Sequence, residues 1–160
     1  MDKRKIFFEE LIKLAEKDEK VVLIVPDVGF SFTESFATKF PKRYFNLGVT
    51  EQSCVVIASA LALDGWKPYV YSMINFVLFR PAEMVRNGIV HHKANVKLLG
   101  VKGSEKYKFL GFSHNLAHET EDTDFCTNIG LDWSVPETEQ AVRDIIKNSY
   151  ESEKPLYIRL

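Results

Sequence analysis

One carboxylate in this sequence stands where it could take part in chemistry. Glu51 follows Thr50, a residue able to cap a helix, and lies just ahead of ten small or apolar residues at 54–63. The helix dipole stabilises a carboxylate in the first turn, so Glu51 could be an ordinary surface residue. The helix is apolar on nearly every side, however, which predicts a central position and a first turn that a ligand or partner can approach. Both interpretations stay open at this point.

A second group combines two aromatic rings with an arginine. In "INFVLFRPAEMVRN" (74–87), Phe76 and Phe79 are three residues apart and Arg80 follows directly. The rings could be core anchors of a helix whose other side is charged and solvated, and the pattern by itself favours this interpretation. They could also form an aromatic platform for a flat heterocycle, with the arginine beside it for an anion.

Two histidines four residues apart raise the question of a metal site. On a helix, the spacing of His114 and His118 would suit a zinc ion, but no third ligand follows at a convincing spacing. We therefore expect no metal ligands in this chain. A glycine-led loop that presents His114 to a polar substrate explains the segment more economically.

The rest of the sequence alternates strand-like and helix-like segments. The strand-like runs, such as the continuous apolar "VVLIV", suit strands that are buried on both faces. They cover residues 21–25, 44–47, 68–73, 95–101, 131–135 and 155–160, and helical patterns cover roughly 3–17, 51–64, 77–92 and 137–152. Such alternation predicts an α/β fold, a three-layer α/β/α sandwich around a mostly parallel sheet.

Functional groups in such a fold collect beyond the carboxyl ends of the strands. Asp27, Glu51, Asn75 with Phe76, and the loop after Val101 all take such positions. We therefore expect four separate stretches to converge on one edge of the sheet. No G-x-S-x-G elbow, Walker A loop or G-x-G-x-x-G fingerprint occurs, which argues against a nucleophilic serine, a P-loop nucleotide or a dinucleotide there.

Composition narrows the class of protein further. The 160 residues fit one domain, residues 1–160, and the net charge of −1 gives no support for a nucleic-acid partner. The N-terminal segment is amphipathic rather than a signal peptide, and no segment approaches the ~20 apolar residues of a membrane span. Two cysteines are too few for a disulfide framework, so we expect a reduced, cytoplasmic setting.

Taken in order, six segments resemble the pyrimidine-binding domain of transketolase-like thiamine diphosphate enzymes. The segments are "FPKRYFNLGVTEQ", "ALALDGWKPYVYSMINFVLFRPAEMVRN", "NVKLLGV", "GFSHN", "VPETEQAV" and "PLYIRL". The similarity runs from about Lys5 to Leu160 and implies the pyrimidine module of the thiamine diphosphate-binding fold. Two parts of a complete transketolase are expected to be missing, the diphosphate-binding domain with its G-D-G…N metal motif and a further C-terminal domain.

The resemblance implies roles for the residues around the cofactor. Glu51 matches the glutamate that hydrogen-bonds N1′ of the aminopyrimidine ring of thiamine diphosphate. An unperturbed glutamate, with a pKa of about 4.3, would be ionised at neutral pH, and burial against the apolar helix would raise that pKa. Phe76 and Phe79 match the aromatic positions that hold the ring, Phe79 by stacking, although Ala82 stands where a third aromatic is often found. Asp27 matches an aspartate near the cofactor and the subunit interface.

The resemblance also implies residues for the substrate. His114 matches a substrate-contacting histidine in a G-x-[ST]-H loop, and Arg80 resembles an arginine of the deoxyxylulose-phosphate synthase branch. Arg159 corresponds to an arginine of the last strand that in some relatives lies near the substrate phosphate. The family's acidic pair after the histidine is displaced here, with His118 followed by Glu119, and this departure bears on substrate specificity.

At the level of function, the resemblance implies a transferase subunit of carbohydrate metabolism. The chain would be the pyrimidine-binding half of a split transketolase, inactive alone and active in two-carbon ketol transfer on a sugar or sugar phosphate. A separate diphosphate-binding subunit with the G-D-G…N motif would bind Mg²⁺, in a homodimer or an α2β2 heterotetramer. Two alternatives stay open, a 2-oxoacid dehydrogenase or decarboxylase β-type subunit, and a non-catalytic scaffolding subunit of the same fold.

Overall fold

The strands of the chain form one parallel sheet in a computed structural model that describes residues 2–28 and 30–160. The strand order is β2-β1-β3-β4-β6-β5, and each neighbouring pair runs parallel. The strands are β1 (Val21–Val25), β2 (Tyr44–Asn46), β3 (Lys67–Met73), β4 (Lys97–Val101), β5 (Trp133–Ser134) and β6 (Leu156–Arg159). All six predicted strands are confirmed, with ends that differ from the expected ones by at most two residues.

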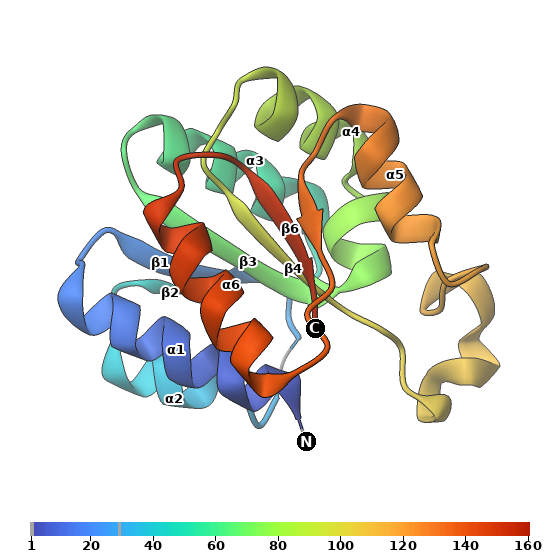
Figure 1. Ribbon diagram of the computed structural model, residues 1–160, viewed down its shortest axis with the longest axis horizontal. Helices are drawn as coiled ribbons and strands as arrows, with labels where there is room; N and C mark the ends of the chain where they lie inside the picture. The colour runs from blue at the N-terminus through green and yellow to red at the C-terminus, as the bar shows by residue number, and fades with distance from the viewer. Residues whose placement is uncertain (1, 29) are drawn as a thin grey trace.

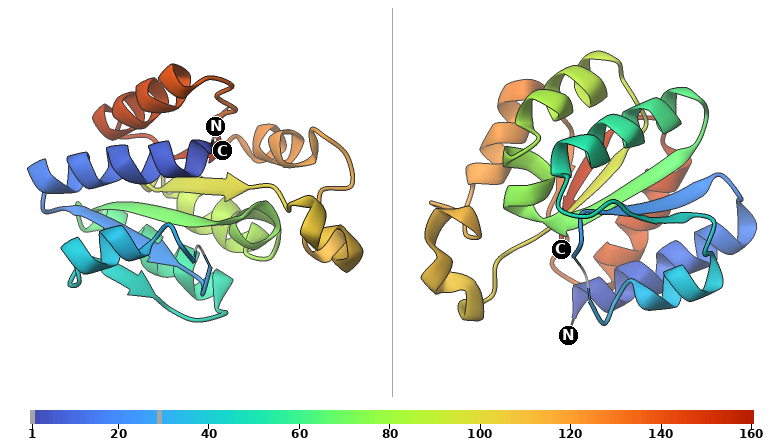
Figure 2. Two further views of the ribbon diagram at one scale, coloured as in Figure 1. Left: turned by 90° about the horizontal axis from the view of Figure 1, so that it is seen from below. Right: turned by 180° about the vertical axis from the view of Figure 1, so that it is seen from behind.

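Helices cover both faces of this sheet (Figure 1). They are α1 (Lys3–Lys17), α2 (Glu34–Lys39), α3 (Glu51–Leu63), the π-helix η1 (Asn75–Phe79), α4 (Ala82–Met84), the π-helix η2 (Val85–His91), the 3₁₀ segment η3 (Glu105–Ser113), α5 (Glu121–Ile129) and α6 (Glu139–Glu151). Helices α1 and α6 lie side by side over one face, and α3, the π-helices and α5 lie on the other (Figure 2). The predicted three-layer α/β/α sandwich is confirmed.

The core explains why β1 is apolar at every position. Leu23 and Val25 pack into the cluster beneath α1 and α6, whereas Ile24 packs into the cluster on the other face. All five residues of the strand are buried. A central parallel strand has no solvated face, so its sequence reads as a continuous apolar run rather than an alternation.

Helix α3 differs from its expected central position. Cys54, Val55 and Ala58 are buried, but Val56 and Leu63 on the opposite side are 50% and 60% exposed. The inward face packs on β3 and η2, and within the described residues the outward face has no such cover. The prediction of a helix buried all round is therefore wrong for this chain by itself, and α3 presents an apolar face to its surroundings.

The predicted helix over 77–92 is interrupted. The chain forms η1, turns at Arg80 and Pro81, and continues as α4 and η2. Proline has no N–H to donate to the preceding turn, and the N–H of Arg80 bonds to the carbonyl of Asn75 five residues back, at 2.9 Å. Wide turns of this kind occur mostly at functional sites.

Three helical segments were not predicted: α2, η3 and α5. Helix α5 has the sequence EDTDFCTNI, whose threonines, aspartates and asparagine are weak helix formers. Its acidic first turn suits the helix dipole, and Gly130 ends it with a positive φ of 77°. Packing of Cys126 and Phe125 onto the core supplies what the local sequence does not.

Both cysteines are buried as free thiols. Burial raises the pKa of Cys54 to about 11 and the pKa of Cys126 to about 12. Because the thiolate is the reactive form, we expect neither thiol to react with Ellman's reagent at pH 8 in the folded protein, and both to react once urea unfolds the chain. Cys54→Ser and Cys126→Ser assign any residual reaction, and fast labelling of the native protein would contradict the burial.

Candidate active site

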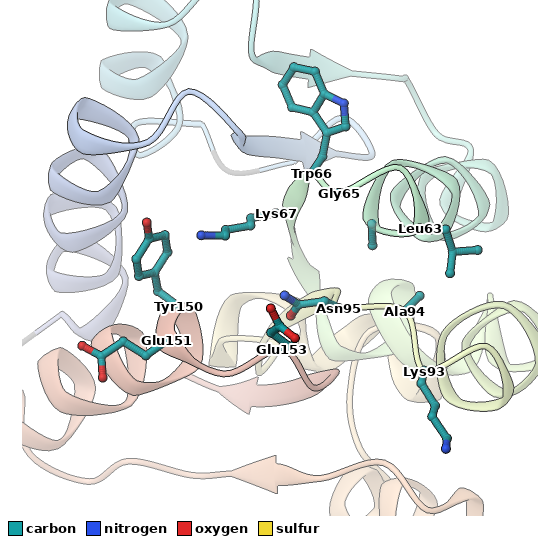
Figure 3. A pocket seen from close by; sticks show the side chains of 11 residues that line it. Leu63, Gly65, Trp66, Lys67, Lys93, Ala94, Asn95, Tyr150, Glu151 and Glu153 are labelled. Carbon is teal, nitrogen blue, oxygen red and sulfur yellow. The ribbon is translucent and has the colours of Figure 1, made fainter.

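The largest depression on the surface lies away from the residues that the sequence singled out (Figure 3). It has a volume of about 480 Å³ and lies at the amino ends of β3 and β4. Its central cation is already paired, because Lys67 forms a 2.8 Å ion pair with Asp18 and its ammonium group lies 4.0 Å from the centre of the Tyr150 ring. These contacts tie the end of α6 to the start of β3 and give a structural account of the depression.

The opposite, carboxyl edge of the sheet carries two smaller depressions. The first, here called the His114 depression, has a volume of about 350 Å³ and is lined by Asp27, Phe76 and His114 together with residues of α1, β3 and η3. The second, the Glu51 depression, has a volume of about 450 Å³ and is lined by the first turn of α3 and Arg80. The structure thus brings five of the seven predicted site residues to one edge of the sheet.

Glu51, Arg80 and Phe76 form the link between these two depressions. Glu51 is only 9% exposed although it opens a helix, and its carboxylate forms an ion pair with the guanidinium of Arg80. The same guanidinium lies over the ring of Phe76, 4.0 Å from its centre, an arrangement that adds a cation–π attraction. The Arg80 side chain is 43% exposed, so solvent weakens the pair and Arg80 can leave at modest cost.

The π-turn sets where these side chains point. The backbone bond from Arg80 to Asn75 places Arg80 over Phe76, and the side-chain amide of Gln52 donates to the Arg80 carbonyl at 3.4 Å. A π-helix rotates a residue three positions on further from its neighbour than an α-helix does. Phe79 accordingly points elsewhere and packs edge-to-face on Phe125 of α5 at 5.7 Å. The structure does not bring Phe79 into either depression.

His114 reaches its depression from the end of η3. Its ring packs edge-to-face on Phe76 with centres 5.0 Å apart and lies nearly parallel to Tyr107 at 6.1 Å. The close approach of this loop to the end of β4 requires a glycine at position 103, where a Cβ atom would lie 2.4 Å from the carbonyl oxygen of His114. The approach fixes where the histidine enters the site.

Asp27 ends β1 with a positive φ of 53°, a conformation that aspartate tolerates better than most residues. Its backbone N–H donates to the side-chain oxygen of Asn46 at 3.1 Å, and the amide of Asn46 donates to the Asp27 carboxylate at 3.2 Å. The bonds tie together the ends of β1 and β2 beside the His114 depression. The backbone conformation of Asp27 is therefore supported from the neighbouring strand.

Sequence reasoning missed three residues that line the His114 depression: Arg4, Lys102 and Tyr107. Arg4 belongs to α1, and its guanidinium lies 4.3 Å from the centre of the Phe32 ring. Tyr107 belongs to η3, which shows no regular hydrophobic period in the sequence. No local pattern marks these residues, because only the fold brings their elements together.

Arg159, at the end of β6, is placed differently from the other predicted residues. It is 8% exposed and donates to the fully buried carboxylate of Asp122 at 3.0 Å and to the backbone carbonyl of Glu119 at 2.7 Å. Tyr157 donates to the other oxygen of Asp122 at 2.6 Å, and burial together with this carboxylate raises the pKa of Tyr157 well above its usual value. Arg159 lines neither depression of the carboxyl edge and neutralises a buried charge.

The arrangement around Glu51 has a definite chemical capacity. A planar group with N–H donors lies on an aromatic face and donates to a carboxylate, and in the chain as it stands the Arg80 guanidinium is that group. A flat nitrogen heterocycle of similar thickness would find the same two partners. Across residues 2–28 and 30–160, no three His, Cys, Asp or Glu side chains cluster in a way that could hold a metal ion.

Comparison with known proteins places the chain among relatives of one kind. The family model described as transketolase, pyrimidine binding domain, matches residues 1–160. One of the two subunits of an apulose-4-phosphate transketolase, from Phocaeicola vulgatus, is 30% identical over 98% of this chain and 50% of the relative. A putative transketolase C-terminal section of Methanocaldococcus jannaschii is 30% identical over 98% of this chain and 49% of the relative.

Solved structures agree with these relatives. A split-gene transketolase, described as an inactive β4 tetramer, superposes with a TM-score of 0.85 at 31% identity, over 99% of this chain and 50% of that one. The chain spans about half the length of the curated relatives that it matches most fully.

The pairing of Arg159 predicts a stability effect. Arg159→Gln leaves the carboxylate of Asp122 buried without its cation, so we expect the free energy of unfolding in urea to fall by about 3–5 kcal/mol. Arg86, which is exposed and bonds only to Asn87, provides the control, since Arg86→Gln should cost less than about 0.5 kcal/mol. Equal stability of the two variants would show that Arg159 does not hold the fold in this way.

Proposed function

The chain belongs to the transketolase pyrimidine-binding domain family, and on this premise we propose that it forms the aminopyrimidine side of a thiamine diphosphate site. The observation that carries the proposal is the arrangement of Glu51, Arg80 and Phe76 at the carboxyl edge of the sheet. A carboxylate and an aromatic face, already held around a planar N–H donor, match the chemistry of an aminopyrimidine ring. Burial of Glu51 by its own helix supports the same role.

In this proposal each residue has a separate task. Thiamine diphosphate, when bound, supplies a carbon centre that attacks carbonyl groups and an electron sink for the bond that breaks. Glu51 holds a proton at N1′ of the pyrimidine, and Phe76 supports the ring from one face. Asp27 and Phe79 lie near the cofactor, Asp27 at the end of β1 and Phe79 behind Phe76 on the π-helix.

Arg80 has two successive positions in this account. Its guanidinium takes the place of the ring in the chain by itself, so it must turn away when the pyrimidine enters. The freed cation then lies beside the His114 depression and can bind an anionic group of the substrate, as a guanidinium binds phosphate or carboxylate. His114 contacts a polar group of the same substrate. Arg159 reaches the substrate only if its pairing with Asp122 opens.

The reaction we propose is two-carbon ketol transfer between sugar phosphates, a reaction of carbohydrate metabolism. One relative is named as a subunit of an apulose-4-phosphate transketolase, which supports a sugar phosphate and a divided enzyme. A second subunit with a G-D-G…N motif would hold Mg²⁺ and the diphosphate, and this chain would be inactive alone. A homodimer or an α2β2 heterotetramer would let that subunit cover the outward apolar face of α3, where Val56 and Leu63 are exposed.

The setting we propose is a reducing one. Two buried, unpaired thiols favour the cytoplasm, where cysteines stay reduced. Within the described chain, no helix is both long and apolar enough to cross a membrane. We further propose that residues 1–160 act as one pyrimidine-binding unit, since the family model and the six-stranded sheet extend over the same stretch.

Glu51→Gln tests the catalytic role in the complex of this chain with its diphosphate-binding partner. Removal of the carboxyl proton is expected to lower kcat for ketol transfer by at least about 100-fold, the usual contribution of a positioned proton donor. The melting temperature should change little, because the pair with Arg80 is partly solvated. Glu83→Gln, at an exposed position of α4, is the matched control and should leave kcat unchanged. Undiminished turnover of Glu51→Gln would favour a non-catalytic scaffolding subunit.

Arg80→Gln tests whether the guanidinium competes with the cofactor. Loss of the ion pair and of the cation–π contact should tighten binding of thiamine diphosphate by about three- to tenfold, measured by calorimetry at fixed Mg²⁺ concentration. Arg86→Gln serves again as the matched control and should bind like the wild type. Weaker binding by Arg80→Gln would mean that Arg80 supports the cofactor instead of standing in for it.

A further inference from the structure

Ser113, directly before His114, makes two hydrogen bonds that together fix a proton. Its hydroxyl oxygen lies 2.9 Å from the carbonyl oxygen of Leu110 and 2.8 Å from Nδ1 of His114. A carbonyl oxygen can only accept, so the single hydroxyl proton of Ser113 must point to Leu110. The serine oxygen is then left with lone pairs only in the direction of the histidine.

The proton on the histidine follows from that count. Because the serine oxygen can only accept from His114, Nδ1 must carry the hydrogen of the neutral imidazole, and Nε2 keeps its lone pair. We propose that Ser113 is a positioning residue that holds His114 in the Nδ1–H tautomer and so presents Nε2 as a proton acceptor to the His114 depression. Within the described part of the chain, no side chain or backbone group bonds to Nε2.

The ring that carries this acceptor is held on both sides. Phe76 packs against it at 80° and Tyr107 lies nearly parallel to it at 21°. The loop itself is tied down, since the side chain of Asn115 donates to the carbonyls of Tyr107 and Gly111 at 3.0 and 2.8 Å. Rotation of the ring would break the bond to Ser113, and the two aromatic neighbours oppose it. Nε2 is therefore fixed in direction as well as in protonation.

The chemistry of such an acceptor points to a class of ligand. A neutral Nε2 with a free lone pair accepts a hydrogen bond from a hydroxyl group, and it can take up the proton when that oxygen reacts. Carboxylate and phosphate oxygens offer it no proton, so His114 selects a hydroxyl rather than the anionic end of a ligand. The role toward substrate rests on the proposed function, whereas the tautomer does not.

The tautomer can be read directly from the full chain labelled with ¹⁵N-histidine, by two-bond ¹H–¹⁵N correlation at a pH where imidazole is neutral. His114→Gln assigns the His114 signals. We expect wild-type His114 to show a protonated Nδ1, as His92 should, because Nδ1 of His92 bonds to a carbonyl at 2.7 Å. Exposed His91 serves as the reference without such a constraint.

Two variants isolate the serine hydroxyl. Ser113→Ala should shift the tautomer ratio of His114 about five- to tenfold toward Nε2–H, the loss expected for one hydrogen bond, and Ser113→Thr should restore it. A protonated Nε2 in the wild type, or an unchanged ratio in Ser113→Ala, would overturn the proposal. In the complex with its partner, Ser113→Ala should also raise KM for the sugar substrate while Ser113→Thr does not. A wild-type tautomer as predicted in a complex without ketol transfer would refute the proposed function alone.

Discussion

The contact of Arg80 with both Glu51 and Phe76 is the interaction on which the site depends. It joins the first turn of α3 to the π-helix that follows β3, and it gives a nearly buried carboxylate its cation. The pair is exposed enough to open and well enough placed to hold the carboxylate and the ring apart by the thickness of a planar group. The chain thus keeps a binding geometry intact that would otherwise be a solvated glutamate beside an aromatic ring.

The rest of the fold positions that contact. The parallel sheet carries the ends of β1, β3 and β4 to one edge, and the wide turn before Pro81 aims Arg80 back over Phe76. Close approach of the η3 loop at Gly103 places His114 on the other side of the same phenylalanine. Phe76 is consequently the wall shared by two depressions, one suited to a heterocycle and one to a polar substrate.

The sequence predicts the strands and the sheet edge well, and the physical reason is burial. Continuous apolar runs such as "VVLIV" have one comfortable place in an α/β fold, so their position follows from composition. Helix α3 was misjudged because an apolar surface that awaits a partner reads in the sequence like one that is already buried. Helix α5 was missed because tertiary packing, not local propensity, stabilises it.

Side-chain direction was the harder part of the site to predict. Phe76 and Phe79 look equivalent in the sequence, yet the π-helix turns only Phe76 toward Glu51. Arg159 looks free for a substrate at the end of a strand, yet a buried aspartate thirty-seven positions earlier takes its charge. In both cases the deciding neighbour is distant in sequence, and no local pattern records it.

The central claim is that Glu51 meets N1′ of an aminopyrimidine ring at this edge of the sheet. The most direct measurement is the ¹⁵N resonance of thiamine diphosphate labelled at N1′, recorded at neutral pH with the chain and its diphosphate-binding partner. The account predicts that the resonance moves on binding toward the position of the N1′-protonated pyrimidine. A bound cofactor whose N1′ resonance stays at the position of the free, unprotonated ring would contradict it.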